Sequence, residues 1–183
     1  MIAKDDYIVV LDFLPNGKPT DRKAEAVAQG IGEKFLNLLE VAVKEGVTLK
    51  AGEKLYVGDD KRDQVKYIRG RIGYSELTNY AKNMIPEIVT GLVNADEKRF
   101  VNFFNKAGPV TTRLHSLELL PGIGKKHMWD IIGERRKKPF ETFKEVQDRV
   151  PMMSDPKGMV IKRILKDLDE SDRYKLFVGN PTL

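Results

Sequence analysis

The chain has 183 residues, of which 41% are apolar and 32% charged, with a net charge of +5 and a pI near 9.2. This length suits one large domain or two small ones with a hydrophobic core, and the positive charge favours an anionic partner. The absence of Cys excludes disulfides, thiolate zinc sites and cysteine nucleophiles. Because His115 and His127 are the only histidines, we expect no multi-histidine metal site and no cofactor.

The first residues contain an apolar run that is too short for a membrane span and is preceded by acidic residues. We therefore expect a cytoplasmic protein with no membrane partner. "YIVVLDFL" (7–14), "KLYVG" (54–58) and the alternating "QVKYIRGRIGY" (64–74) predict short strands joined by turns that contain glycine. Several such strands indicate a small β-barrel over residues 1–74.

The stretch "FLNLLEVAVKEG" (35–46) fits two structures. Phe35, Leu38, Leu39 and Ala42 form a helical stripe, whereas Phe35, Leu39, Val41 and Val43 form one face of a strand. The β-branched valines suit a pleated surface, so we favour a strand.

Beyond Ser75 the apolar period becomes helical, which predicts a helical connector over 75–108. Pro86 predicts a kink or the start of a new helix, and Asp96 is placed as the N-cap of a helix over 97–106. Phe100, Phe103 and Phe104 are spaced as the buried side of that helix. Residues 109–183 also have helical patterns.

The stretch "LELLPGIGKKHMWDII" (117–132) predicts a tight hairpin between two helices. We expect a first helix over 112–119, ended by Pro121, and a second one that begins near Lys125. Gly122 and Gly124 would provide backbone conformations that a side chain hinders, with Ile123 packed beneath. Trp129 adjoins the apolar stripe of the second helix, so we expect it to pack in the core, whereas the two histidines are expected at the surface or as caps.

The start of the second helix is a predicted phosphate site. Backbone N–H groups there lack helical partners and lie at the positive end of the helix dipole. Lys125 and Lys126 add positive charge. A second "GIG" at 30–32 has no preceding Pro and is followed by Glu33, so we expect a bend at the start of a strand instead.

Together, "LLPGIGKK" and the apolar spacing after it resemble the helix-hairpin-helix motif of nucleic-acid-binding proteins. The continuation "IIGERRKKPFETFKEVQDRV" resembles the segment that links two such motifs in tandem domains. "VPMMSDPKGMVIKRIL" falls where a second hairpin belongs, but "SDPKGM" replaces the Gly–apolar–Gly pattern. The resemblance implies a degenerate second hairpin that binds phosphate poorly or not at all.

Further segments, including "AQGIGEKFLNLLEV", "GEKLYVGDDKRDQVKYIRGRIGYSELT" and "DRYKLFV", are similar to an archaeal family of uncharacterised proteins that are described as predicted RNA-binding. The resemblance covers nearly the whole chain. It implies an OB-like N-terminal barrel joined to a helix-hairpin-helix domain. We therefore expect an α+β fold with two domains, an OB-like β-barrel over 1–74 and an all-α tandem helix-hairpin-helix domain over 109–183.

Two further basic clusters are candidate contacts for nucleic acid. In the first, residues 113–138 carry seven basic and three acidic side chains, a net of +4, and include Arg135 and Arg136 near the expected end of a helix. Cations there are also stabilised by the helix dipole without any partner. The second cluster lies on an expected strand, where Tyr67 could stack on bases; it consists of Lys61, Arg62, Lys66, Tyr67, Arg69 and Arg71. A charged edge that only keeps the strand from aggregating is the alternative.

The combined patterns predict a nucleic-acid-binding protein that grips the phosphate backbone through Gly122, Ile123, Gly124, Lys125 and Lys126, with RNA favoured over DNA from the family resemblance alone. One alternative is a DNA repair or nuclease-type enzyme that uses the hairpin as a DNA anchor, although no suitable catalytic context or cluster of acids is evident. The other alternative is a protein-interaction module of a ribonucleoprotein or transcription assembly. We expect no enzymatic activity.

Overall fold

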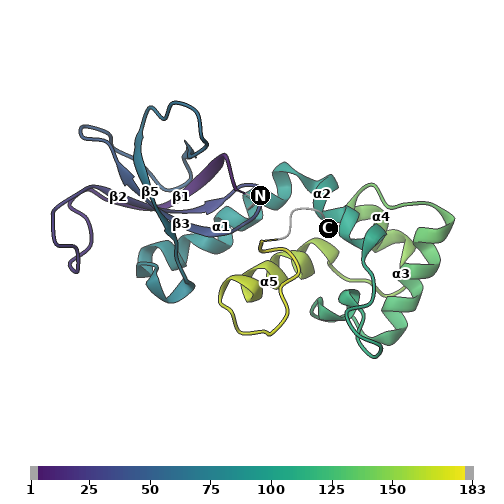
Figure 1. Ribbon diagram of the computed structural model, residues 1–183. Coiled ribbons are helices and arrows are strands. Elements are labelled where there is room, and N and C mark those ends of the chain that lie inside the picture. Colours follow the sequence, from purple (N-terminus) through teal and green to yellow (C-terminus); the bar gives the residue numbers. More distant parts are fainter. Residues whose placement is uncertain (1–3, 180–183) are drawn as a thin grey trace. The chain divides into compact units, whose positions relative to one another are not determined.

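A computed structural model describes residues 4–179 (Figure 1). The chain forms two compact units, each described here by itself. The first contains the residues up to Ile88 together with Leu168–Ser171, and the second contains Val89–Asp167 and the residues from Asp172 on. The structure is mixed α+β, as predicted. The finer domain boundaries at 74 and 108 stay predictions.

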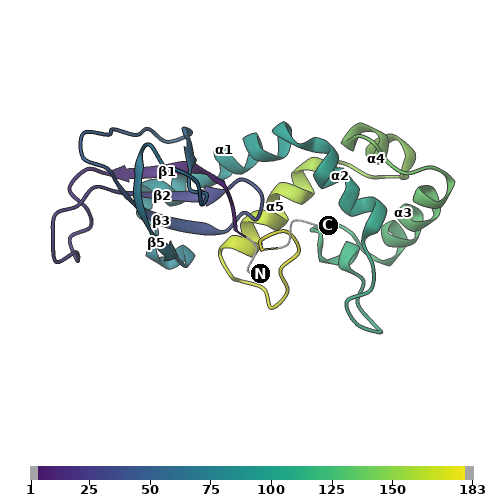
Figure 2. The ribbon, with the colours of Figure 1, turned by 45° about the horizontal axis from the view of Figure 1, so that its top comes forward.

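The first unit contains a curled antiparallel sheet of five strands in the order β4-β1-β2-β3-β5 (Figures 1 and 2). The strands are β1 (Tyr7–Leu14), β2 (Val27–Gly32), β3 (Leu38–Val43), β4 (Lys54–Tyr56) and β5 (Val65–Arg71). The strand interpretation of the ambiguous segment is confirmed by β3, whereas Phe35 lies in the turn before it. The short β4 and the longer β5 are the two edges, so among the described residues the sheet is a half-barrel and not a closed one.

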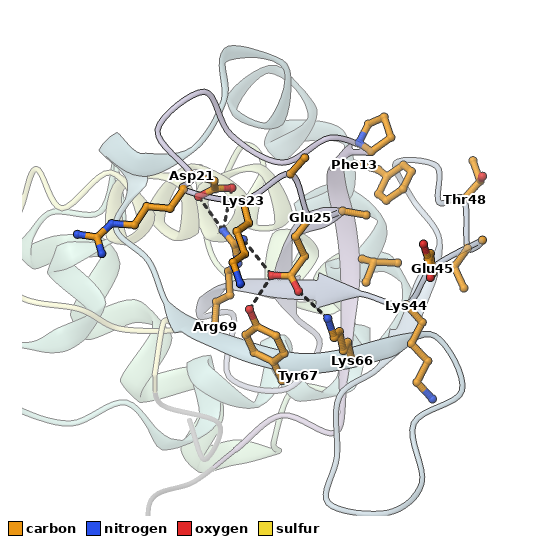
Figure 3. Close-up of a pocket in the computed structure, with 17 residues that line it drawn as sticks. Phe13, Asp21, Lys23, Glu25, Lys44, Glu45, Thr48, Lys66, Tyr67 and Arg69 are labelled. Atoms are coloured by element: carbon orange, nitrogen blue, oxygen red, sulfur yellow. Dashed lines mark hydrogen bonds and ion pairs between the residues drawn. The ribbon is translucent and has the colours of Figure 1, made fainter.

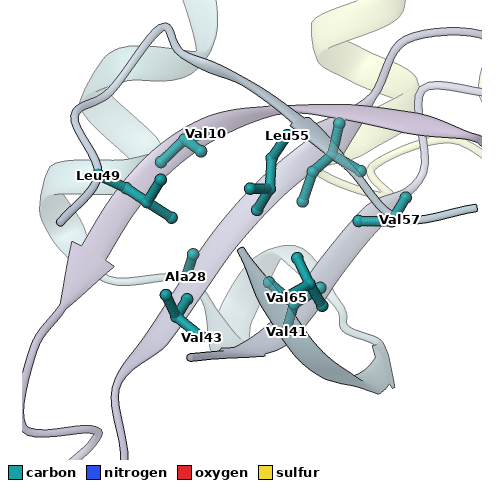
Figure 4. Packing of buried hydrophobic residues seen from close by; sticks show 9 residues of the cluster. Val10, Ala28, Val41, Val43, Leu49, Leu55, Val57 and Val65 are labelled. Atoms are coloured by element: carbon teal, nitrogen blue, oxygen red, sulfur yellow. The ribbon is translucent and has the colours of Figure 1, made fainter. Parts of the chain in front are cut away.

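Aliphatic side chains fill the concave side of this sheet (Figure 4). Val10, Ala28 and Val41 come from the central strands, while Leu55 and Val65 come from the two edges. All five are less than 2% exposed. Burying a Val or Leu side chain contributes about 1.5–3 kcal/mol, so this cluster supplies a large part of the unit's stability.

The expectation that the first Gly-Ile-Gly is a bend at a strand start is wrong, because residues 30–32 form the second half of β2 and are buried. Their role is close packing. A Cβ atom on Gly30 would lie 2.7 Å from Cδ1 of Ile8, and one on Gly32 would lie 2.0 Å from Oδ2 of Asp5. Oδ1 of Asp5 accepts hydrogen bonds from the backbone N–H groups of Lys34 (2.6 Å) and Phe35 (2.9 Å). Gly32 therefore makes room for a carboxylate that holds the β2–β3 turn.

The helical elements are η1 (Tyr74–Glu76), α1 (Asn79–Ala95), α2 (Glu97–Lys106), η2 (Ser116–Leu119), α3 (Lys125–Lys137), α4 (Phe143–Arg149) and α5 (Pro156–Leu168). Pro86 does not start a new helix, because α1 continues through it. Ala81, Ile85 and Val89 on either side of it are buried, and this packing offsets the hydrogen bond that the ring removes. In the described part of the chain, no helix is both long and apolar enough to cross a membrane.

The core of the second unit is built around α2. Phe100, Phe103 and Phe104 are at most 2% exposed, as predicted from their spacing. The ring centroid of Phe103 lies 5.1 Å from that of Phe177, and Phe104 lies 6.4 Å from Phe143. Asp96 is the N-cap residue of α2, although its side chain makes no capping hydrogen bond. Contacts of α2 with distant segments thus hold this unit together.

A buried arginine joins three segments of the second unit. Arg163 of α5 is 1% exposed; its guanidinium lies 2.9 Å from Asp167 and 3.0 Å from Asp172, and it also donates to the backbone carbonyls of Leu119 and Tyr174. Asp167 in turn accepts the backbone N–H groups of the segment 176–178. These acids close α5 and the following turn, and the network fixes the residues before the α3 turn against α5.

Candidate functional site

The turn before α3 has the features of a type II turn. The N–H of Ile123 donates to the carbonyl of Leu120 over 3.2 Å, Pro121 occupies the second position, and Gly122 has a φ of +87°. Gly122 therefore needs its conformational freedom, as predicted. Gly124 does not, because its φ of −99° and ψ of −170° are ordinary extended backbone. Ile123 is buried beneath the turn, as predicted.

The prediction of a first hairpin helix over 112–119 is wrong. Only Ser116–Leu119 are helical, as the single 3-10 turn η2. Residues 109–115 form a tight loop instead, closed by a bridge between Pro109 and His115 and by the bond from Val110 N to Leu114 O. The β-branched Thr111 and Thr112 favour such a loop over a helix. His115 caps η2 by accepting the N–H of Leu117, in agreement with the expected capping role.

The start of α3 is open. Gly124 is its N-cap residue, no side chain caps the helix, and its first helical bond runs from Met128 N to Gly124 O. The backbone N–H groups of the first turn therefore lack helical partners. Gly122, Gly124, Lys125 and Lys126 are exposed. A Cβ atom on Gly124 would find no atom within 4 Å, so a ligand has free access to this point.

The two predicted lysines differ in their surroundings. Nζ of Lys125 lies 2.9 Å from Oε2 of Glu118 and 3.1 Å from the carbonyl of Arg113. The hydrogen bond from the His115 N–H, followed by the bond from Lys125, lowers the pKa of Glu118. Lys126 makes no ion pair within residues 4–179, and its charge is therefore the more available of the two.

A similar backbone turn precedes α5. Met153 N donates to Val150 O over 3.3 Å, Pro151 occupies the second position, and Met152 has a φ of +59°. The segment that corresponds to Pro-Gly-Ile is thus Pro-Met-Met. "SDPKGM", which the sequence placed opposite Gly-Ile-Gly, forms the cap and first turn of α5 instead.

The start of α5 is capped by the side chain of Asp155. Oδ1 of Asp155 accepts the N–H of Gly158 over 3.0 Å. This carboxylate supplies the negative charge that the helix dipole favours, and it occupies the place that a phosphate would take. Lys157 donates to the side chain of Asn94. The two helix starts therefore have similar turns and opposite capping.

Arg135 and Arg136, in the last turn of α3, also differ. Arg135 donates to the carbonyls of Phe104 (3.2 Å) and Ala107 (2.8 Å) at the end of α2, and burial lowers its pKa. This side chain is a cap for α2. Arg136 is exposed and forms no ion pair in the described part of the chain. Of the pair, only Arg136 is available to an external anion.

Trp129 contradicts the expectation of core packing. It lies in the second turn of α3 and is 63% exposed. The buried positions of this helix are Met128, Ile131 and Ile132. The apolar stripe therefore does not include Trp129, and the sequence signal for this was its position beside the stripe and not within it.

On β5, Lys66 and Arg69, two of the five basic residues of the predicted cluster, are paired with acids (Figure 3). Arg69 Nη1 lies 3.1 Å from both carboxylate oxygens of Asp21 and 3.2 Å from Glu40, while Nη2 lies 3.3 Å from Glu25. Glu25 also accepts bonds from Tyr67 (2.6 Å) and Lys66 (3.0 Å). The hydroxyl of Tyr67 is the largest cause that lowers the pKa of Glu25, to about 2. The sequence pattern did not reveal these acidic partners, because Asp21 and Glu25 lie 40 or more residues before β5 and Glu40 lies on β3.

Irregular pairing of β3 with β5 brings these side chains together. The register skips Lys66, between Val65 and Tyr67, and Arg69, between Ile68 and Gly70. Strict alternation is thereby lost, and Lys66, Tyr67 and Arg69 all reach Glu25. They line a pocket of about 1110 Å³ that includes the exposed Arg22 and Lys23.

The remaining members of the cluster lie elsewhere. Arg62 and Arg71 line a second pocket of about 300 Å³, and Nε of Arg62 donates to the carbonyl of Gly58. Lys61 is exposed in the loop before β5. The structure therefore does not bring the six predicted residues together in one site.

Comparison with known proteins gives a family. A family model described as "Protein of unknown function (DUF655)" matches residues 4–179. The chain belongs to this family. A DUF655 relative, "Uncharacterized protein MJ0038" from Methanocaldococcus jannaschii, is 45% identical over 176 residues, covering 95% of this chain and 80% of that protein. The crystal structure of Af1531 from Archaeoglobus fulgidus is similar with a TM-score of 0.83 and 41% identity, covering 95% of this chain and 99% of that one.

The predicted resemblance to an uncharacterised family with archaeal members is thus confirmed. The names of the DUF655 relatives assign no activity, substrate or partner. Among residues 4–179, no group of three or more His, Asp or Glu side chains is arranged to hold a metal ion.

Proposed function

We propose that this DUF655 protein binds nucleic acid by its phosphate backbone, at the start of α3, with RNA favoured over DNA. The open first turn of α3 carries this proposal. It combines an exposed glycine cap, uncapped N–H groups and the free charge of Lys126. The contrast with α5, where Asp155 caps a similarly placed helix, indicates that an open start is a property of α3 and not of the turn.

In this proposal, the second unit acts as a tandem helix-hairpin-helix domain in which the short η2 stands in place of the first helix and the second hairpin is degenerate. The curled sheet acts as an OB-like barrel that is open between β4 and β5. The proposed contacts are Gly122, Gly124, Lys125, Lys126 and Arg136. Backbone contacts of this kind position a strand without reading its bases, so we expect little sequence selectivity from this unit. The preference for RNA rests on the family resemblance alone.

The β5 residues contribute less to this proposal than the sequence suggested. Arg69 is 19% exposed and lies among three carboxylates, and moving it onto a phosphate would break its ion pairs with all three. Arg22 and Lys23, which line the same pocket, are exposed. Any contact of nucleic acid with this pocket therefore involves these two residues ahead of Arg69.

The test is fluorescence anisotropy of labelled RNA and DNA oligonucleotides with the full chain at several salt concentrations. The logarithm of affinity should fall linearly with the logarithm of salt, by about 0.7–0.9 for each phosphate contact. Lys125→Glu combined with Lys126→Glu should weaken binding tenfold or more, because charge-assisted contacts are worth about 1.5–3 kcal/mol each. Lys157→Glu at the closed start of α5 is the matched control and should change affinity less than threefold. A flat salt response, or equal losses in both variants, would reject the proposal.

A protein-interaction module is the second candidate, and a DNA repair or nuclease-type enzyme the third. Capture of cellular partners with and without nuclease treatment separates direct nucleic-acid binding from a protein-interaction module. Partners that remain bound after nuclease treatment, with no oligonucleotide binding by the pure protein, would favour the interaction module. Cleavage of labelled duplex DNA by the pure protein would favour the enzyme.

A further inference from the structure

Trp129 is the most unusual side chain on the surface of the second unit. It is the only Trp of the chain and is 63% exposed, which leaves most of a large apolar ring in water. Among the described residues, no aromatic ring or cation packs on it. Neither ring stacking nor a cation contact therefore accounts for the place of the indole.

The position of Trp129 relates it to the open start of α3. Side chains on a helix lean toward its N-terminus, so the general geometry of a helix directs the indole toward the turn that contains Lys125 and Lys126. Residues three and four apart share a helix face. Lys126, Trp129, Gly133 and Arg136 therefore form one stripe, and all four are exposed.

The stripe is open one turn after the indole. Gly133 carries no side chain, and a Cβ atom there would find nothing within 4 Å. The charges at the two ends, Lys126 and Arg136, are both positive. The nearby Glu134 is paired with Lys137 (2.7 Å) and with Arg149 (3.5 Å). A planar, apolar ligand attached to negative charge complements this surface.

We propose that Trp129 is a stacking platform for an unpaired base, so that α3 takes single-stranded nucleic acid in preference to a duplex. The inference rests on the proposed function and adds the class of ligand. A base that leaves a duplex presents its flat face to the indole, while the phosphates beside it meet Lys126 and Arg136. Stacking on an aromatic side chain is tolerant of sequence and gives affinity without base-edge contacts.

The test uses the full chain, a single-stranded RNA of about a dozen nucleotides, and the same sequence as a duplex. Because Trp129 is the only Trp, selectively excited tryptophan fluorescence reports on this residue alone. Single-stranded RNA should quench it, with saturation at the same concentration as the anisotropy of labelled RNA. Trp129→Ala should weaken binding of the single strand by about 5- to 100-fold and binding of the duplex by less than about twofold. Trp129→Phe should restore part of the loss.

The matched control is Tyr80→Ala, which removes another exposed aromatic ring, on α1, and should leave both affinities unchanged. If the unaltered protein binds neither form of RNA, the proposed function fails and the inference fails with it. If it binds, and the Lys126→Glu variant binds less well, but Trp129→Ala has no effect or weakens both forms equally, only the stacking inference is overturned. Retention of RNA binding together with loss of a captured protein in Trp129→Ala would overturn it in favour of a protein contact.

Discussion

Single residues distinguish the two turns that precede α3 and α5. Gly122 and Met152 occupy equivalent positions with positive φ, where a side chain is strained. Space is not the constraint at Gly122, since a Cβ atom there would lie 3.4 Å from Cε of the flexible Met159 side chain on α5. The cap residues differ more: Gly124 leaves the N–H groups of α3 open, and Asp155 satisfies one of those of α5. An Asp in place of Gly124 should therefore close the start of α3 in the way that Asp155 closes the start of α5.

Gly124→Asp is the sharpest test of this difference. The extended backbone at Gly124 accepts Asp, and an Asp cap stabilises a helix as well as or slightly better than Gly. The free energy of unfolding in urea should stay the same or rise by a few tenths of a kcal/mol. The new carboxylate would occupy the phosphate position, and affinity measured by anisotropy should fall at least tenfold. Unchanged affinity in the folded variant would mean that the start of α3 does not contact the ligand.

The two Gly-Ile-Gly copies should respond in opposite ways to the same substitution. Gly32→Val forces a Cβ atom to 2.0 Å from the Asp5 carboxylate and should destabilise the protein by about 1–3 kcal/mol or more in urea unfolding. The affinity of the molecules that remain folded should not change. Gly124→Val meets no neighbouring atom, so it should cost less stability than Gly32→Val and lose affinity. Similar stability losses in both variants would contradict this assignment.

At the level of elements, β5 and the β1–β2 connection are joined by ion pairs and not by strand pairing. Arg69 binds Asp21 and Glu25 of the connection, and it also binds Glu40 of β3. Lys18 adds a further pair with Glu40 at 2.9 Å. These bonds hold a long loop against an edge strand, which leaves few of the β5 charges for a ligand.

The network should make the stability of the protein sensitive to acid. Glu25 has an ordinary pKa of 4.5 and a folded-state pKa of about 2, so its contribution is fully present above pH 4.5 and is lost as the pH falls toward 2. Urea unfolding at several pH values should show this decline. Glu25→Gln should flatten the decline, and Tyr67→Phe should do so in part because the Tyr67 hydroxyl is the largest cause of the shift. An unchanged slope in Glu25→Gln would show that the network does not form.

At the scale of the whole molecule, the limits of the second unit decide which fragment can fold. A fragment of residues 109–183 contains the proposed site but lacks α2, and with it Phe100, Phe103 and Phe104. Replacing one buried Phe by Ala costs about 3–5 kcal/mol, and whole domains have stabilities of about 5–15 kcal/mol. The unit should therefore not fold without α2.

We expect residues 109–183 to be unfolded by circular dichroism, and residues 89–183, which follow the limits of the second unit, to fold and bind nucleic acid more weakly than the full chain. Isolated residues 4–88 are the control for binding by the sheet. If 89–183 folds and shows no binding at low salt while 4–88 binds as well as the full chain, the site belongs to the first unit.

The sequence by itself determined the features that depend on neighbouring residues. The Pro-Gly turn, the start of α3 at Lys125, the burial of the three Phe residues of α2, and the strand at β3 all follow from local backbone preferences and from the spacing of apolar side chains. The family could also be inferred, because several of its segments are present in order.

Only the tertiary structure decided which charges and rings are available. Asp21 and Glu25 neutralise Arg69 across more than 40 residues of sequence, and Arg135 is used to cap α2, whereas Lys126, Arg136 and Trp129 stay exposed. Sequence gives the identity of a side chain and the period of its element. Its partners depend on which distant segments the fold brings within bonding distance, and an irregular strand register such as that of β5 changes the face on which a side chain lies.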